Sequence, residues 1–263
     1  MPDKSKLTHN EWILLLTAFA AGAVDVISFA TLGGVFASAM TGNFALLAYY
    51  VAQSDSQSAV GSVVALTGFA LGCALGVLQR RGRAQEQALT ILLVSEAGLL
   101  LFFALYAMWT PHVAHAPSVH LQILLLAVAM GLQAVIGQTI NLTTIVFTTT
   151  LTKLVGTIAD SIANGDVTGL KDVKIQSSVV VSYLFGALMS GALIVRGAEE
   201  VVLLPFTGVA FAYVVHRRSR RKALHYRPQR PAAVPKALIR QRICVGAGRF
   251  GRSVRYSGCS SDW

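Results

Sequence analysis

The sequence is poor in charge and in cysteine. Only 13% of its 263 residues are charged, about half of the share that soluble domains usually carry. The three cysteines, Cys73, Cys244 and Cys259, form no CxxC pair, so we expect neither a disulfide framework nor a metal cluster. Each of the six histidines falls in a loop, a tail or the end of an apolar run. Their placement argues against a metalloprotease inside the membrane and against a histidine-activated serine. We therefore expect no enzyme, no cofactor and no metal site.

Long apolar runs dominate what is present. Hydrophobic residues make up 54% of the chain, and a membrane-spanning helix needs about 20 mostly apolar residues in succession. Runs of this kind occur at 12–34, 59–78, 88–109, 120–141, 176–195 and 199–216. The sequence thus predicts an all-α integral membrane protein with six transmembrane helices and the lipid bilayer as a partner.

The excess of positive charge lies in one segment. The net charge is +10, and residues 217–263 hold 13 Lys or Arg against a single acid. This pattern is typical of a disordered basic tail that is attracted to anionic lipid headgroups, and it gives no reason to expect nucleic acid as a partner. We expect an N-terminus over 1–11, a first membrane repeat over 12–109, a second over 120–216 and the tail over 217–263.

Two stretches about 110 positions apart look like diverged copies of one unit. Gly22-Ala23-Val24-Asp25 in the first copy corresponds to Gly131-Leu132-Gln133-Ala134 in the second. Internal duplication in an apolar chain is typical of secondary transporters, whose solute sites lie between the repeats. Small residues recur at every fourth position in both copies: Gly68, Gly72 and Gly76 in the first, Ser182, Gly186 and Ser190 in the second. Such faces let helices approach closely in lipid, and we interpret them as packing faces, within one chain or across a homo-oligomer.

Segments 36–52 and 147–163 decide the topology. If both crossed the membrane, the Arg80–Arg83 cluster would lie outside, against the positive-inside rule. If neither crosses, the basic clusters and both termini lie in the cytoplasm. Each repeat then has three spans, so the second copy is inverted relative to the first, and each copy carries a short re-entrant or half-helix segment. For 147–163 the alternative is a helix lying flat on the inner surface.

Asp25 is the most informative single residue. It follows about fourteen residues of apolar helix, and a carboxylate at that depth costs roughly 2.5–3.5 kcal/mol on insertion scales. It therefore needs a partner or a water-filled cavity. The functional interpretation is a group that relays protons or coordinates a cation, and the structural one is a carboxyl that caps the broken end of a neighbouring helix.

Other polar residues lie near the expected helix breaks. Thr41 and Asn43 can donate or accept hydrogen bonds with backbone groups that a helix break leaves unpaired, and Gly42 tolerates unusual dihedral angles. Gln133 and Asn141 suit a polar solute, yet amides also join helices in lipid. Lys153 either faces Asp25 across the repeat interface or lies among lipid headgroups. The candidate residues for binding a substrate or ion are Asp25, Thr41, Gly42, Asn43, Gln133, Asn141 and Lys153.

The motifs in combination resemble a known family. They are Gly22-Ala23-Val24-Asp25, Leu32-Gly33-Gly34-Val35-Phe36, Met40-Thr41-Gly42-Asn43 and Gly131-Leu132-Gln133, and they are similar to the YoaK family of bacterial membrane proteins, a domain of unknown function. The resemblance covers about residues 10–217. It implies a polytopic inner-membrane protein and a transport role without a settled substrate, and it marks Asp25, Thr41, Gly42, Asn43 and Gln133 as candidate positions. The sequence departs from the family at Thr152-Lys153, where a Thr-Gly pair is usual, and in the long tail after Arg221.

These observations lead to one functional hypothesis and two rivals. We expect a secondary transporter of a small solute in the inner membrane, coupled to protons or a cation, with both termini in the cytoplasm. The rivals are a channel and a membrane scaffold or regulatory protein that moves no solute, in which the duplication serves folding alone.

Overall fold

The computed structural model describes residues 8–110, 117–140, 147–164 and 170–225, which are almost entirely helical. These residues contain no strand, which confirms the predicted all-α class. The helices are α1 (His9–Thr31), α2 (Met40–Ala52), α3 (Ser56–Arg80), α4 (Gln85–Trp109), α5 (Pro117–Thr139), α6 (Phe147–Asn164), α7 (Leu170–Val195), the 3-10 helix η1 (Glu199–Leu203) and α8 (Leu204–His225).

Six helical segments in the described part of the chain are long and apolar enough to cross a membrane. They are α1, α3, α4, α5, residues Val173–Val195 of α7 and the run Glu199–Arg221 formed by η1 and α8. The six predicted spans are therefore confirmed. Pro205 does not interrupt the last span because it lies in the first turn of α8, where its missing N–H would have no intrahelical partner. This helix continues to His225, so the boundary expected at 217 falls inside it. The rest of the predicted tail, 226–263, lies outside the described residues.

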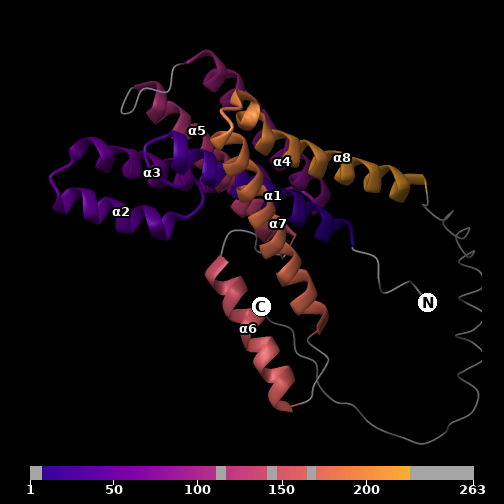
Figure 1. Cartoon of the computed structure of the whole chain (residues 1–263). Coiled ribbons are helices and arrows are strands. Elements are labelled where there is room, and N and C mark those ends of the chain that lie inside the picture. The colour runs from indigo at the N-terminus through magenta and orange to yellow at the C-terminus, as the bar shows by residue number, and fades with distance from the viewer. Residues whose placement is uncertain (1–7, 111–116, 141–146, 165–169, 226–263) are drawn as a thin grey trace, which may run out of the picture. The chain divides into compact units, whose positions relative to one another are not determined.

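The two remaining helices correspond to the segments that we expected not to cross. α2 has 13 residues, about 20 Å of helix, which is too short for a hydrocarbon core of about 30 Å. It lies alongside α3 (Figure 1). α6 has 18 residues and is strongly amphipathic, and it packs against α7.

The helices of the two repeats are interleaved. The most extensive contacts are between α3 and α5 and between α1 and α7, so each main pair takes one helix from each repeat. α4 packs against α5. The buried side chains of α1, α4 and α5 form the centre of the core, among them Ile13, Leu92, Phe103, Leu126 and Met130.

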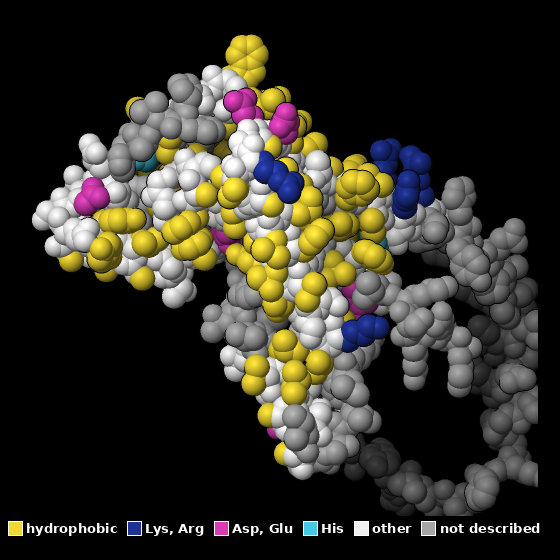
Figure 2. Space-filling view, viewed as in Figure 1, with side chains coloured by type: hydrophobic (Ala, Val, Ile, Leu, Met, Phe, Trp, Pro, Cys, Tyr) yellow, Lys and Arg dark blue, Asp and Glu magenta, His cyan; other side chains and the backbone are white. Residues whose placement is uncertain are grey.

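Large apolar side chains cover the outer surface of the helices. Leu71, Leu75 and Leu78 on α3 and Leu184 and Leu188 on α7 are each about half exposed or more. Apolar side chains spread over the face shown in Figure 2, with few charges among them. Exposed apolar surface of this extent is rare in soluble monomers, and contact with lipid explains it.

Candidate functional site

The carboxylate of Asp25 accepts hydrogen bonds from two separate parts of the chain. Asp25 lies on α1 and is 2% exposed. The backbone N–H of Ser38 donates to Oδ1 at 2.8 Å and the Ser38 hydroxyl donates to Oδ2 at 2.5 Å. The Tyr183 hydroxyl, on α7, donates to Oδ2 at 2.8 Å. The carboxylate therefore joins α1, the loop that precedes α2 and a helix of the second repeat.

The loop of residues 32–39 is shaped so that Ser38 reaches Asp25. Gly33 and Gly34 have φ of +90° and +75°, a region that side chains rarely adopt. At the start of α2, the buried side chain of Asn43 accepts from the N–H of Phe36 at 2.9 Å and donates to its carbonyl at 2.6 Å. Asn43 thus satisfies both backbone groups of Phe36. Inside a membrane protein, backbone groups that are not paired within a helix need such partners. The two bonds also fix the path of the chain into α2.

A close crossing of α1 and α7 brings Tyr183 to Asp25. A Cβ atom at Gly22 would lie 2.1 Å from the carbonyl oxygen of Tyr183 and 3.1 Å from the nitrogen of Ala187. On the other helix, a Cβ at Gly186 would lie 2.0 Å from the carbonyl oxygen of Phe19. Only residues without a side chain permit this approach, and the repeated glycines therefore set the distance between the two helices.

The crossing of α3 and α5 is built in the same way. A Cβ at Gly131 would lie 2.3 Å from the carbonyl oxygen of Phe69 and 2.7 Å from the nitrogen of Cys73, and one at Gly72 would lie 2.2 Å from the carbonyl oxygen of Val128. The residues in the two crossings correspond at the offsets of the sequence repeat: Gly22 with Gly131 and Phe19 with Val128 at 109 positions, Gly72 with Gly186 and Phe69 with Tyr183 at 114 positions. Corresponding residues of the two predicted repeats therefore occupy corresponding places in the two crossings, and each crossing takes one helix from either predicted repeat.

The polar contact occurs at only one of these crossings. Ala134 stands where the first repeat has Asp25, and Phe69 stands where the second has Tyr183. Three donors to one carboxylate offset much of the cost of burying it, since hydrogen bonds to ionised groups are among the strongest in proteins. The same three bonds agree with both interpretations of Asp25. In the structural interpretation, they hold the loop that leads into α2. In the functional interpretation, an incoming proton or cation would compete with them for the carboxylate oxygens.

Two further polar side chains inside the bundle have unused acceptors. Gln133, on α5, donates from Nε2 to the carbonyl oxygen of Thr17 on α1 at 3.0 Å, and its buried Oε1 has no hydrogen-bond partner within the described ranges. Glu96, on α4, is fully buried, and neither carboxyl oxygen has a partner among the described residues. Buried polar atoms without partners are rare, so these acceptors are unusual features of the bundle interior.

Of the other predicted binding residues that the structure describes, neither Thr41 nor Gly42 is hydrogen-bonded to Asp25. Thr41 lies in the first turn of α2 with an exposed side chain. Gly42 packs against the Phe36 ring, whose Cδ2 would lie 3.2 Å from an added Cβ. Asn141 and the side chain of Lys153 lie outside the described residues, so the pairing of Lys153 with Asp25 remains a prediction.

The small-residue faces pack within the chain. A Cβ at Gly68 would lie 3.0 Å from the Cβ of Ala127, and one at Gly76 would lie 2.9 Å from Cγ2 of Val135, both on α5. The Ser182 hydroxyl donates to the carbonyl oxygen of Leu15 on α1 at 2.7 Å. Ser190 is fully buried, and in the part of the chain that the structure describes its hydroxyl has no hydrogen-bond partner.

Ser38 and Tyr183 are the site residues that sequence reasoning missed. Tyr183 follows Ser182 directly, and its counterpart in the first repeat is Phe69. A tyrosine that replaces a phenylalanine between the copies was the available signal for a polar contact. No three His, Cys, Asp or Glu side chains among the described residues are placed to hold a metal ion.

Comparison with known proteins places the chain in a family. The family described as "Protein of unknown function (DUF1275)" matches residues 13–216. The chain belongs to this family. A relative in Bacillus subtilis (strain 168), the UPF0700 transmembrane protein YoaK, is 31% identical over 190 residues, which are 69% of this chain and 82% of that protein. No solved structure matches. The predicted resemblance to YoaK is thereby confirmed. The family match includes most or all of each of the six apolar helices, and the relative is a transmembrane protein, so the chain is a multi-pass membrane protein.

Proposed function

We propose that the chain is a secondary transporter that moves a small solute across the inner membrane, coupled to a proton or a cation. The observation that carries this proposal is the pair of equivalent crossings, α1 with α7 and α3 with α5. Duplicated units that exchange helices around a common centre can adopt two arrangements of nearly equal energy. Alternating access requires such a pair of arrangements.

The direction of each repeat supports the same proposal. The first repeat contributes the spans α1, α3 and α4, and the second contributes α5, α7 and α8. With three spans each, consecutive repeats would enter the membrane in opposite directions. This orientation leaves Arg80 and Arg81, at the C-terminal end of α3, on the same side as Arg217 and Arg218 in α8, as the positive-inside rule favours.

Asp25 is the coupling residue in this proposal. Its contact with Tyr183 is the polar link between the repeats at the α1–α7 crossing. If that crossing opens, the carboxylate loses one donor and becomes available to a proton or a cation. Conversely, a bound proton weakens the carboxylate as an acceptor, because a neutral acid accepts weaker hydrogen bonds than a charged one. Proton binding and opening of the crossing would thus favour each other.

A comparative flux screen tests the proposal. Solute contents of cells and medium would be compared for wild type, Asp25→Asn and Glu200→Gln. Glu200 is an exposed acid in η1, so Glu200→Gln makes the same acid-to-amide change away from the site. Because Asn keeps the volume and an acceptor for Ser38, Asp25→Asn should fold but lose the coupling charge. We expect one solute whose distribution between cells and medium is shifted by wild type and by Glu200→Gln, and is not shifted by Asp25→Asn.

The kinetics of that solute separate the rivals. A transporter shows saturable flux and exchange of labelled for unlabelled solute, whereas a channel shows flux that neither saturates at low concentration nor exchanges. If wild type and Asp25→Asn move every solute equally, Asp25 is not the coupling residue. If wild type moves none, the scaffold interpretation replaces transport.

A further inference from the structure

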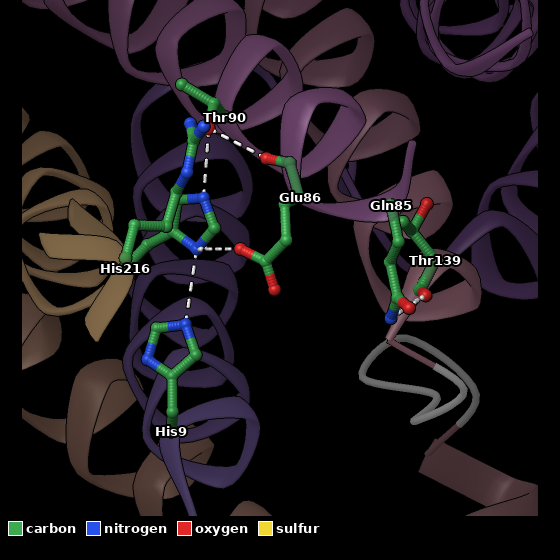
Figure 3. Close-up of polar contacts among 7 residues, drawn as sticks. His9, Gln85, Glu86, Thr90, Thr139 and His216 are labelled. Carbon is green, nitrogen blue, oxygen red and sulfur yellow. Dashed lines mark hydrogen bonds and ion pairs between the residues drawn. The ribbon is translucent and has the colours of Figure 1, made fainter. Parts of the chain in front are cut away.

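A second polar cluster joins the ends of three spans far from Asp25. It consists of His9 on α1, Glu86 and Thr90 on α4, and His216 and Arg220 on α8, and we call it the His216 cluster. His216 is fully buried. His216 Nδ1 lies 3.2 Å from His9 Nε2 and 3.8 Å from Glu86 Oε2, and His216 Nε2 lies 2.9 Å from the hydroxyl oxygen of Thr90 (Figure 3). One imidazole thus links three helices.

The hydrogen bonds determine which nitrogen of His216 carries the proton in the neutral form. The single hydroxyl proton of Thr90 is donated to the carbonyl oxygen of Glu86 at 2.8 Å, while Arg220 donates to the same hydroxyl oxygen at 3.0 Å. Thr90 therefore acts as an acceptor towards His216, and the proton lies on Nε2 of His216. Since neutral imidazole has one donor and one acceptor, Nδ1 of His216 accepts from Nε2–H of His9.

The environment of His9 agrees with this assignment. The other nitrogen of His9, Nδ1, is buried and has no hydrogen-bond partner among the described residues. With the proton on Nε2 this atom is a bare acceptor. The opposite tautomer would leave a buried N–H without a partner, and such orphaned donors are the rarer and more costly case.

A second proton on His216 reverses the contact with His9. Nδ1 of His216 would become a donor and would face the donor Nε2–H of His9. Either His9 moves its proton to Nδ1 and creates a buried N–H without a partner, or Nδ1–H of His216 turns to the Glu86 carboxylate 3.8 Å away. Both outcomes weaken the bond to α1, and the second strengthens the bond to α4.

Glu86 is the charged group that links the buried His216 to solvent. The groups that face it are His9 from α1, Glu86 from α4 and Arg220 on its own helix. The Glu86 side chain is 58% exposed, whereas that of His216 is 1% exposed. Glu86 therefore connects the buried imidazole to solvent and attracts the proton, while Arg220 opposes its arrival.

We propose that the His216 cluster is a proton-binding site in which protonation of His216 moves its hydrogen bond from His9 on α1 to Glu86 on α4 and releases the start of α1 from α8. The proposal does not depend on which solute the protein moves, or on transport at all. It assigns to His9 and His216 a shared role in controlling the end of the bundle where α1 begins and α8 ends.

Amide hydrogen exchange in the full chain, embedded in lipid nanodiscs, tests this proposal. Exchange in the first turns of α1 would be measured at pH 7.5 and 5.5, corrected for the intrinsic pH dependence and referred to α5. We expect the corrected exchange of α1 in wild type to rise about fivefold at the lower pH, the factor that one net hydrogen bond is worth. His216→Gln, which cannot gain a proton, should show no rise.

Two further variants keep the test specific. His120→Gln changes a half-buried histidine on α5 and should retain the rise seen in wild type. His9→Phe keeps a ring against His216 but removes the donor, so its α1 should exchange faster at pH 7.5 already and show little further change. A rise in His216→Gln equal to that in wild type, or no rise in wild type, would overturn the proposal.

Discussion

Substituting alanine for Gly22 should force α1 away from α7 and lower the free energy of unfolding. The added Cβ would lie 2.1 Å from the carbonyl oxygen of Tyr183, well inside the 3.0 Å below which real Cβ contacts are essentially absent. The obstructing atom belongs to the backbone, so no side-chain rotation relieves the clash, and the helices must separate by about 0.9 Å or more. Overpacking of this kind costs about 1–3 kcal/mol, and the better helix propensity of alanine offsets about 1 kcal/mol of it.

The matched control is Gly98→Ala on α4. A Cβ at Gly98 meets nothing within 4 Å, so this variant gains helix propensity without a clash and should be unchanged or stabilised by up to about 1 kcal/mol. The assay is equilibrium unfolding in mixed micelles with increasing sodium dodecyl sulfate, followed by circular dichroism. The reasoning is refuted if Gly22→Ala unfolds at the same detergent fraction as Gly98→Ala.

The equivalent crossing supplies an internal check. Gly131→Ala places its Cβ 2.3 Å from the carbonyl oxygen of Phe69, so its loss of stability should resemble that of Gly22→Ala. The two variants should differ in function, because only the clash at Gly22 displaces Tyr183 from Asp25. Unequal losses of stability would show that the two crossings are not equivalent in energy.

Two other residues of the candidate site give sharper tests of role. Asn43→Ala removes both hydrogen bonds to the backbone of Phe36 and should lower the free energy of unfolding by about 1–3 kcal/mol; a loss below about 0.5 kcal/mol in the same detergent titration would contradict the role of Asn43 in fixing the loop. Gln133→Met keeps a similar volume, removes one bond to Thr17 and eliminates an unpartnered acceptor, so stability should change by less than about 1.5 kcal/mol. If Gln133 binds the solute, flux should nevertheless fall, and unchanged flux would identify it as a packing residue.

Much of the fold was predictable because membrane spans depend on local composition. Each of the six apolar runs became a candidate span, and 36–52 and 147–163 became the helices α2 and α6, which are not among the candidate spans. The spacing of Gly68, Gly72 and Gly76 indicated a packing face correctly. It did not indicate the partner, since a small-residue face fits any helix that approaches it, and only the folded chain shows that α3 packs on α5.

The contacts of the candidate site were less accessible because they join distant residues. Asp25 was identifiable from its depth in an apolar run, but Tyr183 lies 158 positions away. His9 and His216 lie 207 positions apart, and in the sequence each is simply a histidine near the end of a span. Local patterns show that such a residue needs a partner, whereas the arrangement of the helices decides which residue becomes that partner.

The most direct test of the central claim is the sidedness of the start of α3 and the end of α6. Gln57 and Ala163 are both exposed, in the first turn of α3 and at the end of α6, and each would carry a single cysteine in a chain without Cys73, Cys244 and Cys259. Cells would be treated with a membrane-impermeant maleimide before and after permeabilisation. Inverted repeats predict that the cysteine at 57 reacts in intact cells and the one at 163 only after permeabilisation. Reaction of both from the same side would contradict the inverted arrangement and the transport proposal built on it.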